Sequence, residues 1–255
     1  VKESGISHYI EHMLFKGTKK RTAKQIAETL ESVGGQMNAF TAKEHTCYYA
    51  KCLNEDFDLA LELFEDMYHN SLFDAAETER EKGVILEEIN MYDDSPEDLV
   101  HDVFAEKLWG IHPYGRPTIG TRETVKNTDS NKLRQYINNN YLPDKMVIAV
   151  AGNVKHEQVI QSVNKYFAND KGTSSAETIN IPPTYSGYSH LQKDIEQTHL
   201  CLGVPGVAEY CDDYYTANIL STILGGGVSS RLFQEAREQR GLCYTAFSYN
   251  TFYKK

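Results

Sequence analysis

The chain has 255 residues, a formal net charge of −10 at pH 7 and five cysteines. It contains no run of eighteen apolar residues, so no membrane-spanning helix is predicted, and its negative charge makes nucleic acids and anionic membranes poor partners. The cysteine count is odd and shows no metal-binding or thioredoxin-like spacing, which favours free thiols in a reducing compartment and predicts a cytoplasmic protein.

Hydrophobic periodicity, together with capping and turn residues, predicts the helices and strands. In chain order, the pattern predicts a helix that carries residues 8–12, helix 22–33, strands 38–41 and 46–50, helix 54–70 and helix 74–94. A helix that begins at Asp129 is followed by strand 146–151 and helix 155–167. Beyond residues 168–189, which are rich in Ser, Thr, Gly and Pro, we expect a strand near 198–204, a helix ending at 225–227 and a strand from Tyr244.

The most informative string in the chain is His8-Tyr9-Ile10-Glu11-His12. Residues four positions apart on a helix lie one above the other, so both imidazoles come within reach of one metal ion. Glu11 lies on the flank of the same turn, close enough to hold a metal-bound water without being a ligand. This is the spacing of the inverted zinc-peptidase motif. Histidine pairs on helices can also be simply solvated, and a catalytic zinc ion needs a third protein ligand.

The helix expected over residues 74–94 supplies two candidates for that third ligand. Glu81 and Glu88 lie seven positions apart, so they share one helical face within about 20°, whereas Glu87 points elsewhere. The buried face of this helix is predicted to carry Val84, Ile85, Ile89 and Met91. A carboxylate facing a histidine pair completes a two-histidine, one-glutamate zinc set. Spacing alone does not choose between Glu81 and Glu88.

Six stretches of the chain carry a resemblance to a known family. They are residues 5–18 (GISHYIEHMLFKGT), 35–41 (GQMNAFT), 79–89 (EREKGVILEEI), 224–227 (LGGG), 230–238 (SRLFQEARE) and 240–244 (RGLCY). These stretches resemble the pitrilysin/insulinase family of zinc metallopeptidases, which includes the mitochondrial processing peptidase and its bacterial relatives. They run from one end of the chain to the other, and together they are far more specific than any one motif.

The resemblance implies a role for each residue of the motif. It implies that His8, His12 and Glu88 bind one Zn²⁺ ion per chain, and that Glu11 is the general base that takes the proton of a zinc-bound water. The family also has a supporting glutamate one heptad before its glutamate ligand, and this position is Glu81. By resemblance, Glu81 orients a histidine and tunes the metal.

The resemblance also nominates residues that bind substrate. Arg237 and Tyr244 would reach over the zinc from a second domain and grip the peptide. Asn38, Ala39 and Phe40 belong to a strand whose edge would accept the substrate as an added strand, with main-chain hydrogen bonds that tolerate many sequences. By composition alone, Phe40 is an ordinary sheet residue.

The expected fold class is α+β, with two related αβ domains that each have a mixed sheet and helices packed on one face. Residues 1–170 would form the zinc-carrying domain, residues 171–189 a linker, and residues 190–255 the start of a ligand-free copy. The family normally has strands before the first histidine and more sequence after the last residues present here. We therefore expect that N-terminal strands and a C-terminal part are missing from this sequence.

These expectations describe a zinc-dependent metalloendopeptidase that cleaves unfolded peptides or flexible protein termini. It would belong to the processing-peptidase-like group and be bacterial and cytoplasmic. The acidic composition predicts a preference for basic peptides. Family members are dimers of two-domain chains or single longer chains, and a homodimer is the expected assembly. The alternative is a catalytically silent member that acts as a peptide-binding or scaffold subunit. Retention of all the motif residues argues against that alternative.

Overall fold

A computed structural model of the chain describes residues 3–168, 172–173 and 181–254. The described residues fall into two compact units, the first holding residues 3–168, 172–173 and 185–200 and the second residues 181–184 and 201–254. The predicted linker, residues 171–189, lies partly outside the described residues. Its described part, residues 172–173 and 181–189, contains no helix or strand. The domain boundaries suggested by the sequence stay a prediction.

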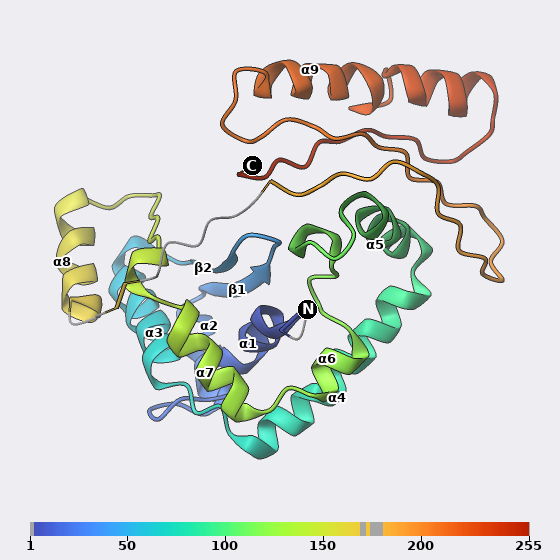
Figure 1. Ribbon diagram of the computed structural model, residues 1–255. Coiled ribbons are helices and arrows are strands. Elements are labelled where there is room, and N and C mark those ends of the chain that lie inside the picture. The colour runs from blue at the N-terminus through green and yellow to red at the C-terminus, as the bar shows by residue number, and fades with distance from the viewer. Residues whose placement is uncertain (1–2, 169–171, 174–180, 255) are drawn as a thin grey trace. The chain divides into compact units, whose positions relative to one another are not determined.

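The first unit contains most of the regular structure (Figure 1). Its helices are α1 (Ile6–Leu14), α2 (Ala23–Glu31), α3 (Phe57–Asn70), α4 (Ala75–Asp94), α5 (Pro96–Trp109), α6 (Arg122–Lys126), α7 (Ser130–Asn140) and α8 (His156–Phe167). Short 3₁₀ turns lie at Asn54–Asp56, Pro113–Gly115 and Pro143–Lys145. The strands are β1 (Gln36–Thr41) and β2 (Thr46–Lys51), an antiparallel pair. The second unit contains α9 (Tyr214–Gly225) and a π-helical segment, Phe233–Gln239. The α+β fold class is confirmed.

Local signals explain where the principal helices begin. Thr22 forms a capping box with Gln25 at the start of α2. The side chain of Asp74 accepts hydrogen bonds from the backbone N–H groups of Ala76 and Glu77 at the start of α4. Both helices begin within a residue of the predicted position. None of the helices in the described residues has the length and apolar composition of a membrane span.

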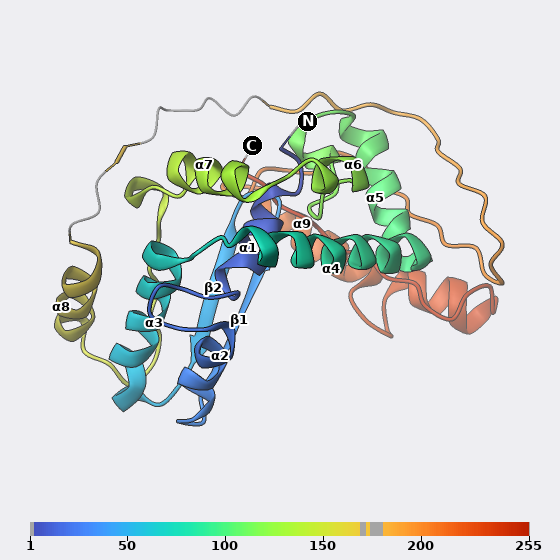
Figure 2. The same cartoon turned by 90° about the horizontal axis from the view of Figure 1, so that it is seen from below.

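Helix α1 lies at the centre of the first unit (Figures 1 and 2). It contacts β1, β2, α4 and α7, and it buries almost all of its apolar side chains. The hydroxyl of Tyr9, 1% exposed, donates a hydrogen bond of 2.5 Å to the backbone oxygen of Thr78 in α4. Ile10 of α1 and Ile85 of α4 are both 0% exposed and belong to the same core. This packing fixes the position of α1 against α4.

The start of α1 depends on two glycines in contact. Gly5 and Gly120 both have φ of +86°, in the left-handed region that favours glycine. A Cβ on Gly5 would lie 2.4 Å from the backbone oxygen of Ile119, and a Cβ on Gly120 would lie 2.7 Å from that of Ser4. Neither position has space for a larger residue.

A buried carboxylate ties the segment after α1 to α3. Asp66 is 0% exposed and accepts hydrogen bonds from Thr18 at 2.7 Å, Arg21 at 2.8 Å and Asn70 at 2.9 Å. Burial acts to raise the pKa of Asp66, but these hydrogen bonds and the charge of Arg21 outweigh it, so the pKa lies below its usual range. The ionised carboxylate of Asp66 therefore holds the segment between α1 and α2 in place against α3.

The structure corrects four sequence expectations. Residues 146–151, residues 198–204 and the chain from Tyr244 are not strands, since among the described residues the only strands that pair into a sheet are β1 and β2. Val147 is 89% exposed and Leu202 is 92% exposed. A β-rich sequence becomes a strand only where a neighbour supplies ladder hydrogen bonds. In α4, Ile85 and Ile89 are buried as predicted, whereas Val84 and Met91 are exposed because they lie on the opposite flank.

Candidate metal centre

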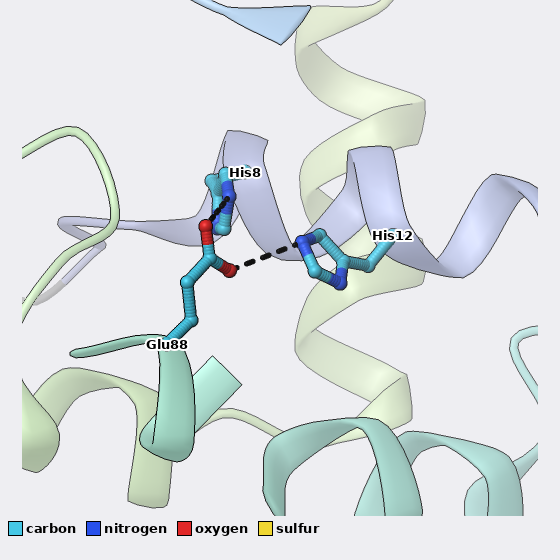
Figure 3. Close-up of side chains that lie close together, drawn as sticks. All are labelled: His8, His12 and Glu88. Carbon is cyan, nitrogen blue, oxygen red and sulfur yellow. Dashed lines mark ion pairs between the residues drawn. The ribbon is translucent and has the colours of Figure 1, made fainter. Parts of the chain in front are cut away.

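Two helices bring three potential metal ligands together (Figure 3). His8 and His12 project from one face of α1, and Glu88 reaches toward both rings from α4. One carboxylate oxygen of Glu88 lies 3.6 Å from Nε2 of His8, and the other lies 3.5 Å from Nε2 of His12. Potential ligand atoms of all three residues lie within 4.8 Å of one another. The structure thus brings Glu88, rather than Glu81, between the two histidines.

These separations are close to those between the ligands of a zinc ion. With zinc–ligand distances near 2.0–2.1 Å, two ligand atoms of a tetrahedral site lie about 3.3 Å apart. Each histidine nitrogen lies within a few tenths of an ångström of that distance from one oxygen of Glu88, at 3.6 Å for His8 and 3.5 Å for His12, and one ligand atom from each of the three residues lies within 4.8 Å of the others. Two imidazole nitrogens and one carboxylate oxygen are also the donor set of catalytic zinc, which keeps its fourth position for water or substrate.

His8 is held in the protonation state that a metal ligand requires. Burial, and then the nearby charge of His12, lower its pKa from 6.5 to about 4. Its ring is therefore neutral near pH 7, with a nitrogen lone pair available. The Nδ1 atom of His8 is buried and has no hydrogen-bond partner among the described residues.

His12 is oriented by a second carboxylate. Its Nδ1 lies 2.8 Å from Oε1 of Glu81, and the ammonium of Lys16 donates to the other oxygen at 2.7 Å. Glu81 is 4% exposed, so water does not compete for these contacts. A proton on Nδ1, donated to Glu81, leaves the lone pair of His12 on Nε2, the nitrogen that faces Glu88. Glu81 lies next to the cluster and supports it, without being one of the three facing groups.

Negative charge accumulates around Glu88. Burial, and then the charges of Glu11 and Glu81, raise its pKa and outweigh the lowering effect of His12. A carboxylate whose charged form is disfavoured in this way gains from a bound cation. The electrostatics and the geometry of the cluster therefore favour the same kind of ligand.

Glu11 follows His8 by three positions on α1 but is not part of the three-residue cluster. It accepts a hydrogen bond from the hydroxyl of Thr41, the last residue of β1. The buried phenols of Tyr48 and Tyr141 lie nearby, and burial raises the pKa of Tyr141 to about 12 and that of Tyr48 well above its usual value. Sequence reasoning missed the contact of Thr41, because no local pattern indicates that the end of a strand will meet Glu11.

Sequence profiles of two domains match the chain. The profile described as insulinase (peptidase family M16) matches residues 1–122, and that of the peptidase M16 inactive domain matches residues 127–255. The chain belongs to peptidase family M16, the insulinase/pitrilysin family. The resemblance seen in the sequence motifs is thereby confirmed.

Bacterial M16 relatives carry zinc-protease names. "Uncharacterized zinc protease YmxG" of Bacillus subtilis is 43% identical over 98% of this chain, which spans 61% of that protein. "Uncharacterized zinc protease SCO5738" of Streptomyces coelicolor is 41% identical over 97% of this chain, which spans 56% of it. This M16 chain therefore spans about three-fifths of the length of these relatives.

Solved structures of bacterial proteases share the fold. A protease from Helicobacter pylori is 26% identical, with a TM-score of 0.84 over 100% of this chain and 63% of that one. The periplasmic protease PqqL of Escherichia coli is 25% identical, with a TM-score of 0.63 over 72% of this chain and 21% of that one.

The substrate-binding residues expected from the M16 resemblance lie in two places. Asn38, Ala39 and Phe40 are in β1, one edge of which pairs with β2 while no strand of the described chain occupies the other. Phe40 is 47% exposed. Arg237 and Tyr244 are in the second unit, where the guanidinium carbon of Arg237 lies 5.4 Å from the centre of the Tyr244 ring. Their role at the metal centre stays a prediction.

Proposed function

We propose that this chain is the zinc-carrying part of a metalloendopeptidase of the processing-peptidase-like group, which hydrolyses peptide bonds in unfolded peptides or flexible protein termini. The observation that carries the proposal is the facing arrangement of His8, His12 and Glu88. The M16 family and the zinc-protease names of the relatives support it.

In this proposal His8, His12 and Glu88 hold the zinc ion. When bound, zinc supplies an acidified water molecule and polarises the carbonyl of the peptide. Glu11 accepts a proton from the attacking water as its oxygen bonds to the carbonyl carbon. It then delivers the proton to the leaving nitrogen as the C–N bond breaks, so that it returns to its ionised form. Glu81 keeps the ring of His12 in the orientation and tautomer that metal binding needs.

The substrate is proposed to lie along the edge of β1 that no strand of the described residues occupies, next to Asn38, Ala39 and Phe40. Backbone hydrogen bonds to a strand edge give affinity without demanding a particular sequence. Arg237 and Tyr244 would grip the peptide from the second unit. The net charge of −10 favours basic peptides. A bacterial cytoplasmic location and a homodimer complete the proposal.

Zinc content and peptide cleavage of the full-length wild-type protein, beside Glu11→Gln, test the proposal. We expect stoichiometric zinc in both proteins and cleavage of a quenched basic peptide by the wild type alone. Glu11→Gln turning over at the wild-type rate would remove Glu11 from the mechanism. His8→Ala and Glu88→Ala should lose zinc, and full retention by either would disprove its role as a ligand.

The alternative function is a catalytically silent subunit that binds peptides or acts as a scaffold. Residues 127–255 match a domain that is described as inactive, and this match is the observation that favours the alternative. A silent subunit has no chemical reason to keep His8, Glu11, His12 and Glu88 together. Peptide binding without cleavage by the zinc-loaded full-length protein would establish this alternative.

The expected preference for basic substrates has its own test. Equal cleavage of matched Lys/Arg-rich and Asp/Glu-rich peptides would reject that preference.

A further inference from the structure

Thr41, the last residue of β1, makes a side-chain contact with the proposed general base. Its hydroxyl donates a hydrogen bond to Oε2 of Glu11. An ionised carboxylate has no proton to give, so the hydroxyl of Thr41 is necessarily the donor. Among the described residues, Thr41 is the side chain that hydrogen-bonds this carboxylate.

The hydroxyl of Thr41 is itself held from the opposite strand. Thr46 is the partner of Thr41 in the register of β1 and β2, and the two hydroxyl oxygens lie 3.3 Å apart. Because the proton of Thr41 is given to Glu11, Thr46 is the donor between the two hydroxyls. Threonine is β-branched and has few accessible side-chain rotamers. The two threonines therefore direct one hydroxyl at Glu11.

The turn between β1 and β2 is tied to the rest of the first unit. The ammonium of Lys43 donates a hydrogen bond to the backbone oxygen of Arg116. The hydroxyl of Tyr114, which is 3% exposed, donates to Oε1 of Glu44 at 2.5 Å. These two contacts hold the end of β1, where Thr41 lies, against the segment that follows α5.

From these contacts, we infer that Thr41 is a positioning residue for Glu11, holding Oε2 in place and leaving Oε1 free to accept the proton of the attacking water. The inference rests on the proposed peptidase function. A general base must lie within hydrogen-bond reach of the proton that it takes. A glutamate side chain rotates about three single bonds, so a fixed oxygen keeps the carboxylate in its working orientation.

Two substitutions at position 41 separate the hydroxyl from the shape of the side chain. Thr41→Val removes the hydroxyl at a similar shape, and Thr41→Ser keeps the hydroxyl. In the zinc-loaded full-length protein, we expect Thr41→Val to lower kcat by ~10–100-fold with KM nearly unchanged, and Thr41→Ser to restore kcat. Zinc content and melting temperature should stay at wild-type values in both.

A second readout needs neither zinc nor turnover. In crystal structures of the zinc-free variants, the Glu11 carboxylate should keep its orientation in Thr41→Ser and turn away in Thr41→Val. A wild-type kcat in Thr41→Val overturns the inference. An equal loss of kcat in Thr41→Val and Thr41→Ser also overturns it. Inactive Glu11→Gln beside fully active Thr41→Val rejects only the role of Thr41. Zinc-loaded wild type that cleaves nothing rejects the peptidase proposal and this inference together.

Discussion

Removing the carboxylate of Glu81 should weaken zinc binding although Glu81 is not one of the three facing groups. Its side chain is 5% exposed and contacts His12 at 2.8 Å and Lys16 at 2.7 Å. In Glu81→Ala, water cannot easily replace the acceptor for Nδ1 of His12, and the ring loses the contact that fixes its tautomer. Loss of such a partner lowers metal affinity by ~10–100-fold, which corresponds to ~1.4–2.7 kcal/mol.

Zinc titration against a competing chelator measures this change directly. Glu81→Gln should lose less affinity, since its amide oxygen can still accept from His12 while Lys16, 32% exposed, turns to solvent. Glu87→Ala is the matched control, because Glu87 is an exposed glutamate on the same helix. Wild-type zinc affinity in Glu81→Ala would refute the reasoning, and so would an equal loss in Glu87→Ala.

Three further substitutions test the packing and charges around the centre. Ile10→Ala removes a side chain that is 0% exposed and should lower the free energy of unfolding in urea by ~2–5 kcal/mol. Arg21→Ala removes the cation that contacts the buried carboxylate of Asp66 at 2.8 Å and leaves the more distant Lys20, at 3.9 Å, so it should cost up to ~3 kcal/mol in the same assay. The pKa of His8 is about 4 when folded and 6.5 when unfolded, so the unfolded chain binds more protons between these values. Metal-free wild type should therefore lose up to ~3 kcal/mol as the pH falls from about 6.5 to 4, and metal-free His8→Gln should lose less.

The sequence predicts well those parts of the molecule that depend on local signals. The helical spacing of His8 and His12, the capping of α2 by Thr22 and the β1–β2 hairpin all follow from nearby residues. Helical periodicity narrows the third ligand to Glu81 or Glu88, and both residues are found at the centre. Choosing between them needs the distance between two helices, which no local pattern contains.

The features that sequence reasoning misses depend on contacts between distant segments. Thr41 meets Glu11 because a strand end and a helix flank come together, and neither residue indicates the other in the sequence. The apolar run 146–151 has strand-like composition, yet strand formation depends on a neighbour. Val84 and Met91 are apolar but exposed, because the buried face of α4 is narrower than the spread of its apolar residues suggests.

The paired glycines at the start of α1 have a consequence for protein engineering. Because the backbones at Gly5 and Gly120 are in close contact, the loop that contains Gly120 supports the start of the helix that carries His8 and His12. A methyl group at either glycine would clash with the facing backbone, displace that helix and shift both imidazoles with it. Grafting or shortening this loop is therefore a change to the metal centre, even though the loop contributes no side chain to it.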